Sequence, residues 1–179
     1  MGNNELIPSG AAPEVFTRYP ENFWTALFAA GLLRARSAPQ GLAEVPVWWK
    51  EQQQHDGNLA EVIGPTFEVH VCEAWRECGS SPDLRIESPH ATLVVETKVL
   101  DNLSSRQMEL FDRMAGLANS KAKVYLLLAP DGWGEGTMYP GRLHQFYQRG
   151  SNTKVRAGFL SLAKTASWAW SLLQLGSYP

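Results

Sequence analysis

The stretch PDLRIESPHATLVVETK, residues 82–98, decides the fold that we expect for this chain. Ser88-Pro89-His90-Ala91 has the composition of a tight turn, with proline at its second position. The short segment 83–87 before it and the largely apolar segment 91–99 after it are both typical of strands, so they predict an antiparallel hairpin. The continuous apolar run of the second segment indicates a central strand that is covered on both faces.

The hairpin brings two carboxylates together. If the strands pair across this turn, the numbers of facing residues sum to 179, so Asp83 faces Glu96 and the two Cβ atoms lie about 4.5–5.5 Å apart. Two opposed carboxylates repel in a structural sheet, whereas a divalent cation between them turns repulsion into attraction. Lys98 projects to the same face as Glu96 and can orient or deprotonate an attacking water.

The segments before the hairpin predict a helix and a strand. Phe23, Leu27, Phe28, Leu32 and Leu33 recur at helical spacing. Residues 66–75 alternate like a strand, and residues 37–64 are interpreted as a long connection. That connection carries Trp48 and Trp49, which we interpret as packing residues rather than as platforms for base stacking.

The segments after the hairpin predict a helical crossover to a further buried strand. A helix is expected to begin with Ser104 or Ser105 as its cap, and the strand at 123–129 then lies parallel to its partner. Residues 154–162 can add a strand and residues 163–175 a helix. The pattern predicts one α/β (α+β) domain over residues 1–179, with a mixed central sheet flanked by helices and a loose lead-in at 1–13.

Three sequence motifs together resemble one enzyme superfamily. Pro82-Asp83 followed by Glu96-Thr97-Lys98 is similar to the signature of the PD-(D/E)XK nucleases. The run Arg106-Gln107-Met108-Glu109-Leu110-Phe111 resembles a Gln-led helix motif of several branches, and Pro20-Glu21-Asn22-Phe23 opens a helix where many members place a metal-binding Glu. The resemblance covers residues 14–130 and implies the restriction-endonuclease-like αβββαβ core, which leaves 131–179 as a C-terminal strand/helix extension.

The resemblance implies a Mg²⁺ or Mn²⁺ site. Asp83 and Glu96 would bind the ion, together with the backbone carbonyl of Thr97, and Glu21 would reach it directly or through water. Glu14 is the alternative to Glu21 for this last role.

The resemblance also implies the roles of the catalytic residues. Lys98 would act on the nucleophilic water, and Gln107 would position the water, the lysine or a phosphate. Phe111 occupies the position where related motifs often have Tyr, so no side-chain hydroxyl group is present at that position.

Each of these residues also has a purely structural interpretation. Asp83 could simply follow Pro82 in a turn, Lys98 could pair with Asp101 on the surface, and Gln107 could be an ordinary residue of a helix cap. The functional interpretation rests on all of them occurring in the right order of elements.

Charge is divided unevenly along the chain. Residues 1–98 carry 7 basic and 13 acidic side chains, whereas residues 99–179 carry 9 and 5. No Asp or Glu occurs after residue 135, so we expect the basic side chains of this part to contact nucleic acid: Arg142, Arg149, Lys154 and Arg156. The alternative is an ordinary solvated surface, with the interleaved aromatic residues in the core.

The sequence therefore predicts a metal-dependent nuclease, with DNA favoured over RNA, that acts in defence, repair or mobile-element processing. The alternative is a non-catalytic module that keeps the fold and binds nucleic acid or protein. The short chain suggests a homodimer or a protein partner. The chain lacks an apolar run of about 18 residues and a secretory signal, so we expect a cytoplasmic protein with no membrane contact. Cys72 and Cys78 are expected to be buried free thiols.

Overall fold

Five strands form one mixed sheet at the centre of the protein. The computed structural model describes residues 21–37, 39–49, 57–135 and 139–175. The strands lie in the order β3-β4-β5-β6-β7, in which β3, β4 and β5 are antiparallel neighbours and β6 and β7 run parallel to β5. Their bounds are β3 (Glu68–Val71), β4 (Leu84–Glu87), β5 (Ala91–Thr97), β6 (Ala122–Ala129) and β7 (Arg156–Ser161).

The register of the β4–β5 hairpin confirms the prediction from the sequence. Leu84 faces Val95 and Ile86 faces Leu93, and the turn is closed by the Ser88 N–H, which donates to the Ala91 carbonyl at 2.9 Å. All seven residues of β5 are buried, as expected for a central strand. The parallel pairing of β5 with β6 is also as predicted.

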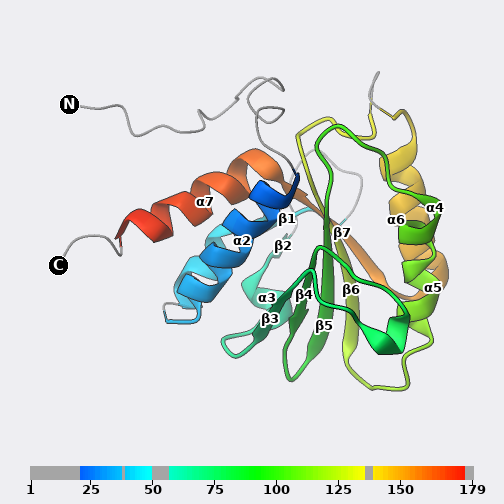
Figure 1. The fold of residues 1–179 in the computed structure, drawn as a ribbon, viewed down its shortest axis with the longest axis horizontal. Coiled ribbons are helices and arrows are strands. Elements are labelled where there is room, and N and C mark those ends of the chain that lie inside the picture. The colour runs from blue at the N-terminus through cyan, green and yellow to red at the C-terminus, as the bar shows by residue number, and fades with distance from the viewer. Residues whose placement is uncertain (1–20, 38, 50–56, 136–138, 176–179) are drawn as a thin grey trace.

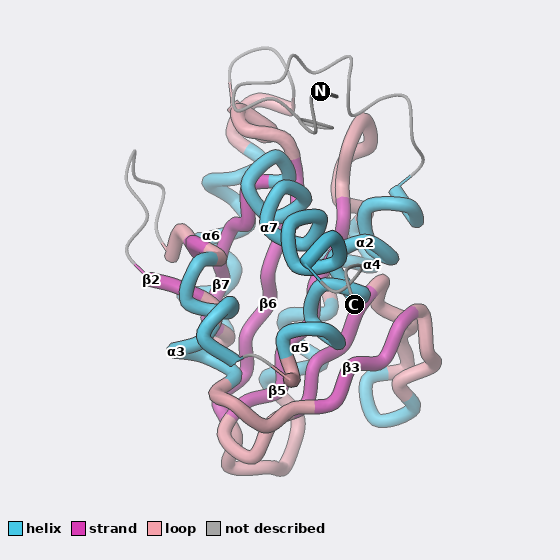
Figure 2. The backbone as a smooth tube through the Cα atoms, turned by 90° about the vertical axis from the view of Figure 1, so that its left-hand side faces the viewer, coloured by secondary structure: helices cyan, strands magenta, loops and turns pink. Residues whose placement is uncertain are grey.

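Helices cover both faces of this sheet (Figure 1). α2 (Glu21–Ala35) and α7 (Leu162–Leu175) lie on one face, and α4 (Ser105–Met108), α5 (Leu110–Ala115) and α6 (Arg142–Thr153) lie on the other. Figure 2 looks onto the sheet from the side of α2 and α7. The side chains of β5 alternate between the two cores: Leu93 and Val95 join the α2/α7 core, and Val94 joins the α5/α6 core.

Several elements differ from the prediction. The strand expected at 66–75 is only four residues long, and the helix expected from Ser104 is divided into α4 and α5. The connection at 37–64 contains short elements: η1 (Pro39–Glu44), β1 (Pro46–Val47), β2 (Gly57–Asn58) and α3 (Ala60–Ile63). A further short helix, η2 (Arg76–Cys78), follows β3. The lead-in at 1–13 and Glu14 lie outside the described residues.

The 12-residue helix α6 was not predicted at all. Its apolar side consists of Leu143, Phe146 and Gly150, a helical spacing that the glycine-rich stretch before it obscured. The interpretation that the aromatic residues between the C-terminal basic residues belong to the core is correct for Phe146, which is fully buried. Trp49 is likewise buried, and the half-buried ring of Trp48 packs edge-on against Phe159 of β7 at 6.1 Å, so both tryptophans are packing residues as predicted.

We expect Gly31→Ala to destabilise the protein by about 1–3 kcal/mol, because overpacking of a tight contact forces backbone shifts. A Cβ at this position would lie 2.7 Å from Cβ and 3.0 Å from Cα of Ala169, where α2 packs on α7. Gly116→Ala is the matched control, since the nearest atom to its Cβ lies at 3.4 Å, and it should change stability by less than about 1 kcal/mol. Equal urea midpoints for wild type and Gly31→Ala would contradict this packing.

Candidate functional site

Asp83 lies just before β4 and forms a hydrogen bond with the last residue of β5. The Thr97 N–H donates to Oδ2 of Asp83 at 2.8 Å. Extending the observed register places Pro82 opposite Thr97, and proline has no N–H to give to the Thr97 carbonyl. Since the N–H and C=O of one strand residue point to the same side, the Thr97 carbonyl is directed to the end of β4, where Asp83 lies. Asp83 therefore does not merely occupy a turn, because its carboxylate accepts a hydrogen bond from the end of β5.

Glu96 is a buried carboxylate beside Asp83. Its side chain is only 3% exposed, and Nε2 of Gln107 donates to its Oε2 at 2.7 Å. Burial, first, and the charge of Asp83, second, raise the pKa of Glu96 to about 8, although Lys98 and the Gln107 hydrogen bond act in the opposite direction. The site therefore disfavours two negative charges unless a cation is added.

Lys98 follows β5 and forms an ion pair with the first residue of α2. Its Nζ lies 3.2 Å from Oε2 of Glu21, and the Val99 N–H donates to Oε1 of the same carboxylate at 2.9 Å. Lys98 is 7% exposed, so its partner is Glu21 rather than the surface residue Asp101. Glu21 was expected to bind the metal, and the structure places it against Lys98 and Val99.

Gln107 has both of the roles that the sequence left open. Its Oε1 accepts from the Ser104 N–H at 2.9 Å, and the Ser104 Oγ accepts from the Gln107 N–H at 3.2 Å, which makes a capping box at the start of α4. Its Nε2 reaches Glu96 in the adjacent strand. The cap and the contact with the carboxylate are made by the two ends of one amide group.

Two hydroxyl residues near the site were missed from the sequence. Oγ1 of Thr25 in α2 lies 2.8 Å from Oγ1 of Thr97, and both side chains are buried. Oη of Tyr125 in β6 donates to the Gln107 carbonyl at 3.2 Å, and burial raises the pKa of Tyr125 well above its usual value. Tyr125 carried a recognisable signal, because a phenol inside the apolar run 123–129 must find a hydrogen-bond partner.

The oxygen atoms of this site fit a small, hard cation. Within the described part of the chain, no group of three or more His, Cys, Asp and Glu side chains can hold a metal ion. Asp83, Glu96 and the Thr97 carbonyl are the groups that could hold a cation here, with water supplying the remaining ligands. This composition fits Mg²⁺ or Mn²⁺, which keep several waters, and does not fit a structural zinc site.

Cys72 departs from the expectation of a buried thiol. Cys78 is buried, but Cys72 is exposed because it directly follows the edge strand β3, with a left-handed backbone at φ 50°. Its Sγ contacts the Asp83 carbonyl oxygen at 3.7 Å. Partial burial, and then the charges of Asp83 and Glu96, raise the pKa of the Cys72 thiol, so it stays protonated beside the carboxylates.

Of the four basic residues expected to bind nucleic acid, two already have partners within the protein and two lie at the start of β7. Arg149 pairs with Asp112, and Arg142 donates to Oε1 of Gln145 at 2.9 Å. Arg156 faces Val124 in the register of β6 and β7, four residues before Leu128, which faces Thr97. Arg156 thus lies about 13 Å back along the strands from the end of β5, and Lys154 precedes it by two residues at the end of α6.

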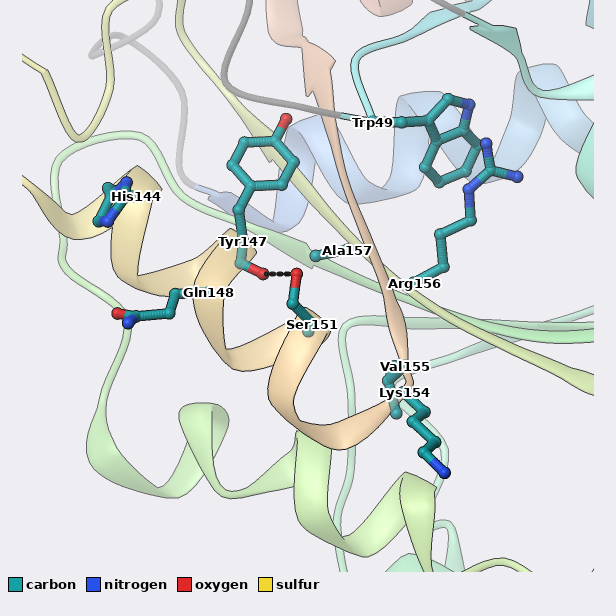
Figure 3. A pocket seen from close by; sticks show the side chains of 10 residues that line it. Trp49, His144, Tyr147, Gln148, Ser151, Lys154, Val155, Arg156 and Ala157 are labelled. Carbon is teal, nitrogen blue, oxygen red and sulfur yellow. Dashed lines mark hydrogen bonds between the residues drawn. The ribbon is translucent and has the colours of Figure 1, made fainter.

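A surface hollow of about 590 Å³ lies beside Lys154 and Arg156, between α6 and the start of β7 (Figure 3). The guanidinium of Arg156 lies over the ring of Trp49 at 3.6 Å, and Lys154 points in another direction (Figure 3). The hollow is therefore separate from the carboxylate site, and its two cations do not converge on one point.

No helix among the described residues is long and apolar enough to cross a membrane. No protein-family model, curated protein or solved structure matches this chain.

Proposed function

We propose that the protein is a metal-dependent nuclease that hydrolyses phosphodiester bonds, with DNA preferred to RNA, on a restriction-endonuclease-like αβββαβ core. The observation that carries the proposal is the placement of Asp83 and Glu96 at the ends of two paired strands, with Lys98 two residues further on. Mg²⁺ or Mn²⁺ is the implied cofactor.

The energetics of the carboxylate pair favour a functional interpretation. A buried carboxylate beside a second one costs stability, because burial and the charge of Asp83 raise the pKa of Glu96 from its ordinary value of 4.5 to about 8. Carboxylates with pKa values raised in this way cluster at functional sites. A divalent ion bound by Asp83, Glu96 and the Thr97 carbonyl would remove this cost.

The surrounding residues can carry out hydrolysis by an attacking water. A bound divalent ion supplies charge that polarises the scissile phosphate and lowers the pKa of water. Lys98 orients that water and offsets the negative charge that develops on the phosphate. Glu21 holds the ammonium group of Lys98 in place, and Gln107 holds the carboxylate of Glu96.

The order of elements also supports the proposed core. α2, the meander β3-β4-β5, the helices α4 and α5, and the parallel strand β6 follow one another as helix, three strands, helix and strand. The segment after β6 adds α6, β7 and α7 to this core. A homodimer or a protein partner is the proposed assembly for cleavage of both strands of a duplex.

Asp83→Asn is expected to abolish cleavage that Mg²⁺ or Mn²⁺ supports in the wild type and that EDTA removes, because the variant loses one of two charged ligands. We would measure plasmid, linear duplex DNA, single-stranded DNA and RNA as substrates. Glu44→Asn is the control for loss of an exposed carboxylate. Equal cleavage by wild type and Asp83→Asn would point to a contaminant, and no cleavage by either would contradict the proposal.

The alternative function is a binding module without catalysis. The observation that favours it is the position of Lys154 and Arg156 beside a hollow away from the carboxylates. Binding of DNA that is lost in Lys154→Ala with Arg156→Ala, in a wild type that never cleaves, would support this alternative.

A further inference from the structure

Each of the two carboxylates has one oxygen already occupied by a hydrogen bond from within the protein. Oδ2 of Asp83 accepts from the Thr97 N–H at 2.8 Å, and Oε2 of Glu96 accepts from Nε2 of Gln107 at 2.7 Å. The two side chains also form a hydrogen bond with each other, and a cation between them would replace that contact and bind one further oxygen of each. In this arrangement each carboxylate would contribute one oxygen to a cation, and neither would bind it with both oxygens.

The amide of Gln107 is held in the orientation that this arrangement needs. Its Oε1 accepts from the Ser104 N–H at 2.9 Å and lies 3.1 Å from the Ser104 Oγ. A backbone N–H can only donate, so the amide oxygen must face Ser104 and the amide nitrogen must face Glu96. Tyr125 holds the backbone of the same residue, because its Oη donates to the Gln107 carbonyl oxygen at 3.2 Å.

The number of oxygens that a carboxylate offers separates two kinds of cation. Mg²⁺ and ions of similar size take six ligands in near-octahedral geometry, commonly one oxygen from each of one or two carboxylates plus waters. Ca²⁺ takes six to eight oxygens at longer distances and is well served by a bidentate carboxylate. A Glu96 that keeps one oxygen on Gln107 suits the smaller ions.

We propose that the Gln107 amide, held by the backbone N–H of Ser104, sets the cation preference of the site by keeping Glu96 a single-oxygen ligand. The inference rests on the ion site of the proposed function and adds its selectivity to it. Tyr125 supports the same arrangement by holding the backbone of Gln107. Thr97 plays the corresponding part for Asp83 through its own N–H, which no side-chain substitution can remove.

The test compares the binding of Mn²⁺ and Ca²⁺ to the full chain by calorimetry, without nucleic acid. Wild type is expected to bind Mn²⁺ more tightly than Ca²⁺, and Gln107→Met, which removes the amide and keeps the chain length, is expected to lower that ratio at least fivefold, because Glu96 can then turn both oxygens to the ion. Ser104→Ala removes the capping hydroxyl but keeps the backbone N–H that holds the Gln107 amide oxygen, so it should lower the ratio less than Gln107→Met. Ser105→Ala, at the next position of α4, is the matched control and should leave the ratio unchanged.

Gln107→Leu serves as a second variant if Gln107→Met unfolds, since it also removes the amide that contacts Glu96. An unchanged ratio in either folded variant, or wild type that binds Ca²⁺ as tightly as Mn²⁺, would overturn the selectivity inference. Cleavage assays distinguish failure of the selectivity inference from failure of the proposed nuclease function. Selective binding without any cleavage would overturn the nuclease and leave the inference standing, and a wild type that binds neither ion would overturn both.

Discussion

Lys98→Ala is expected to lower the rate of metal-dependent cleavage by about 10²–10⁴-fold, the range typical for loss of a group that moves or orients a proton. Lys98 lies beside the carboxylate pair and is held by Glu21, so its loss leaves the proposed metal ligands in place and removes the ammonium group that we propose acts on the attacking water. Binding of Mn²⁺ should therefore persist in the variant. Single-turnover cleavage of a fluorescent duplex and calorimetry would measure the two effects separately.

The same substitution should have only a moderate effect on folding. Glu21 keeps the hydrogen bond from the Val99 N–H, and 26% of its side chain is exposed, so water can solvate the carboxylate that Lys98 leaves. We expect a loss of about 1–2 kcal/mol, below the cost of breaking a fully buried pair. A urea titration of both proteins would verify that the lower cleavage rate of the variant is not caused by unfolding.

Glu21→Gln is the variant that tests how Lys98 is held. A glutamine can still accept from Val99, but it no longer attracts the ammonium group, so the rate should fall less than in Lys98→Ala. Mn²⁺ affinity distinguishes the two roles of Glu21: it stays unchanged if Glu21 only holds the lysine, and it falls if Glu21 is a ligand. Full activity in Lys98→Ala would contradict the catalytic role of this site.

The hairpin could be predicted from the sequence because its register is a local property. A four-residue turn fixes which residues face each other, and one correct pair determines all the others, so Leu84 opposite Val95 followed from Ser88 opposite Ala91. The central position of β5 was equally local, since its apolar run needs cover on both faces. Asp83 and Glu96 came together for these reasons alone.

The partners of Lys98 and Gln107 could be predicted only in part. Glu21 and Lys98 are 77 residues apart, and their contact depends on how α2 lies over the end of β5. The buried pair of Thr25 and Thr97 is one contact between α2 and the end of β5, and a threonine inside a helix gives no signal for such a contact. For Gln107, the cap and the carboxylate contact looked like alternatives because the sequence does not show that one amide reaches both.

The basic residues were predicted from charge alone, and charge does not determine position. The absence of Asp and Glu after residue 135 is real, but α6 was not recognised. Without that helix, the sequence could not show that Arg142 begins it whereas Lys154 follows its last turn. The pairing of Arg149 with Asp112 likewise depends on α5 and α6 packing side by side.

In the metal-free protein, stability is expected to fall as the pH rises from about 4.5 to about 8, because of Glu96. Its pKa is raised in the folded state, so over this interval the unfolded chain releases a proton that the folded protein retains. Below the interval both states are protonated, and above it both are ionised, so the slope vanishes at each end. At about 1.4 kcal/mol per unit, the full effect is on the order of 3–5 kcal/mol.

Glu96→Gln removes this titration and should make the metal-free protein more stable than wild type at pH 8, while the two are similar near pH 4.5. Other groups titrate in the same interval, so the measured quantity is the difference between the variant and wild type in urea unfolding at each pH. Glu44→Gln, at an exposed carboxylate, should show no such difference. Added Mg²⁺ should stabilise wild type at pH 8 but not Glu96→Gln, because the ion relieves the repulsion between Asp83 and Glu96. A difference between variant and wild type that does not change with pH would mean that Glu96 is ionised in the folded protein throughout, and that water or Lys98 already offsets its charge.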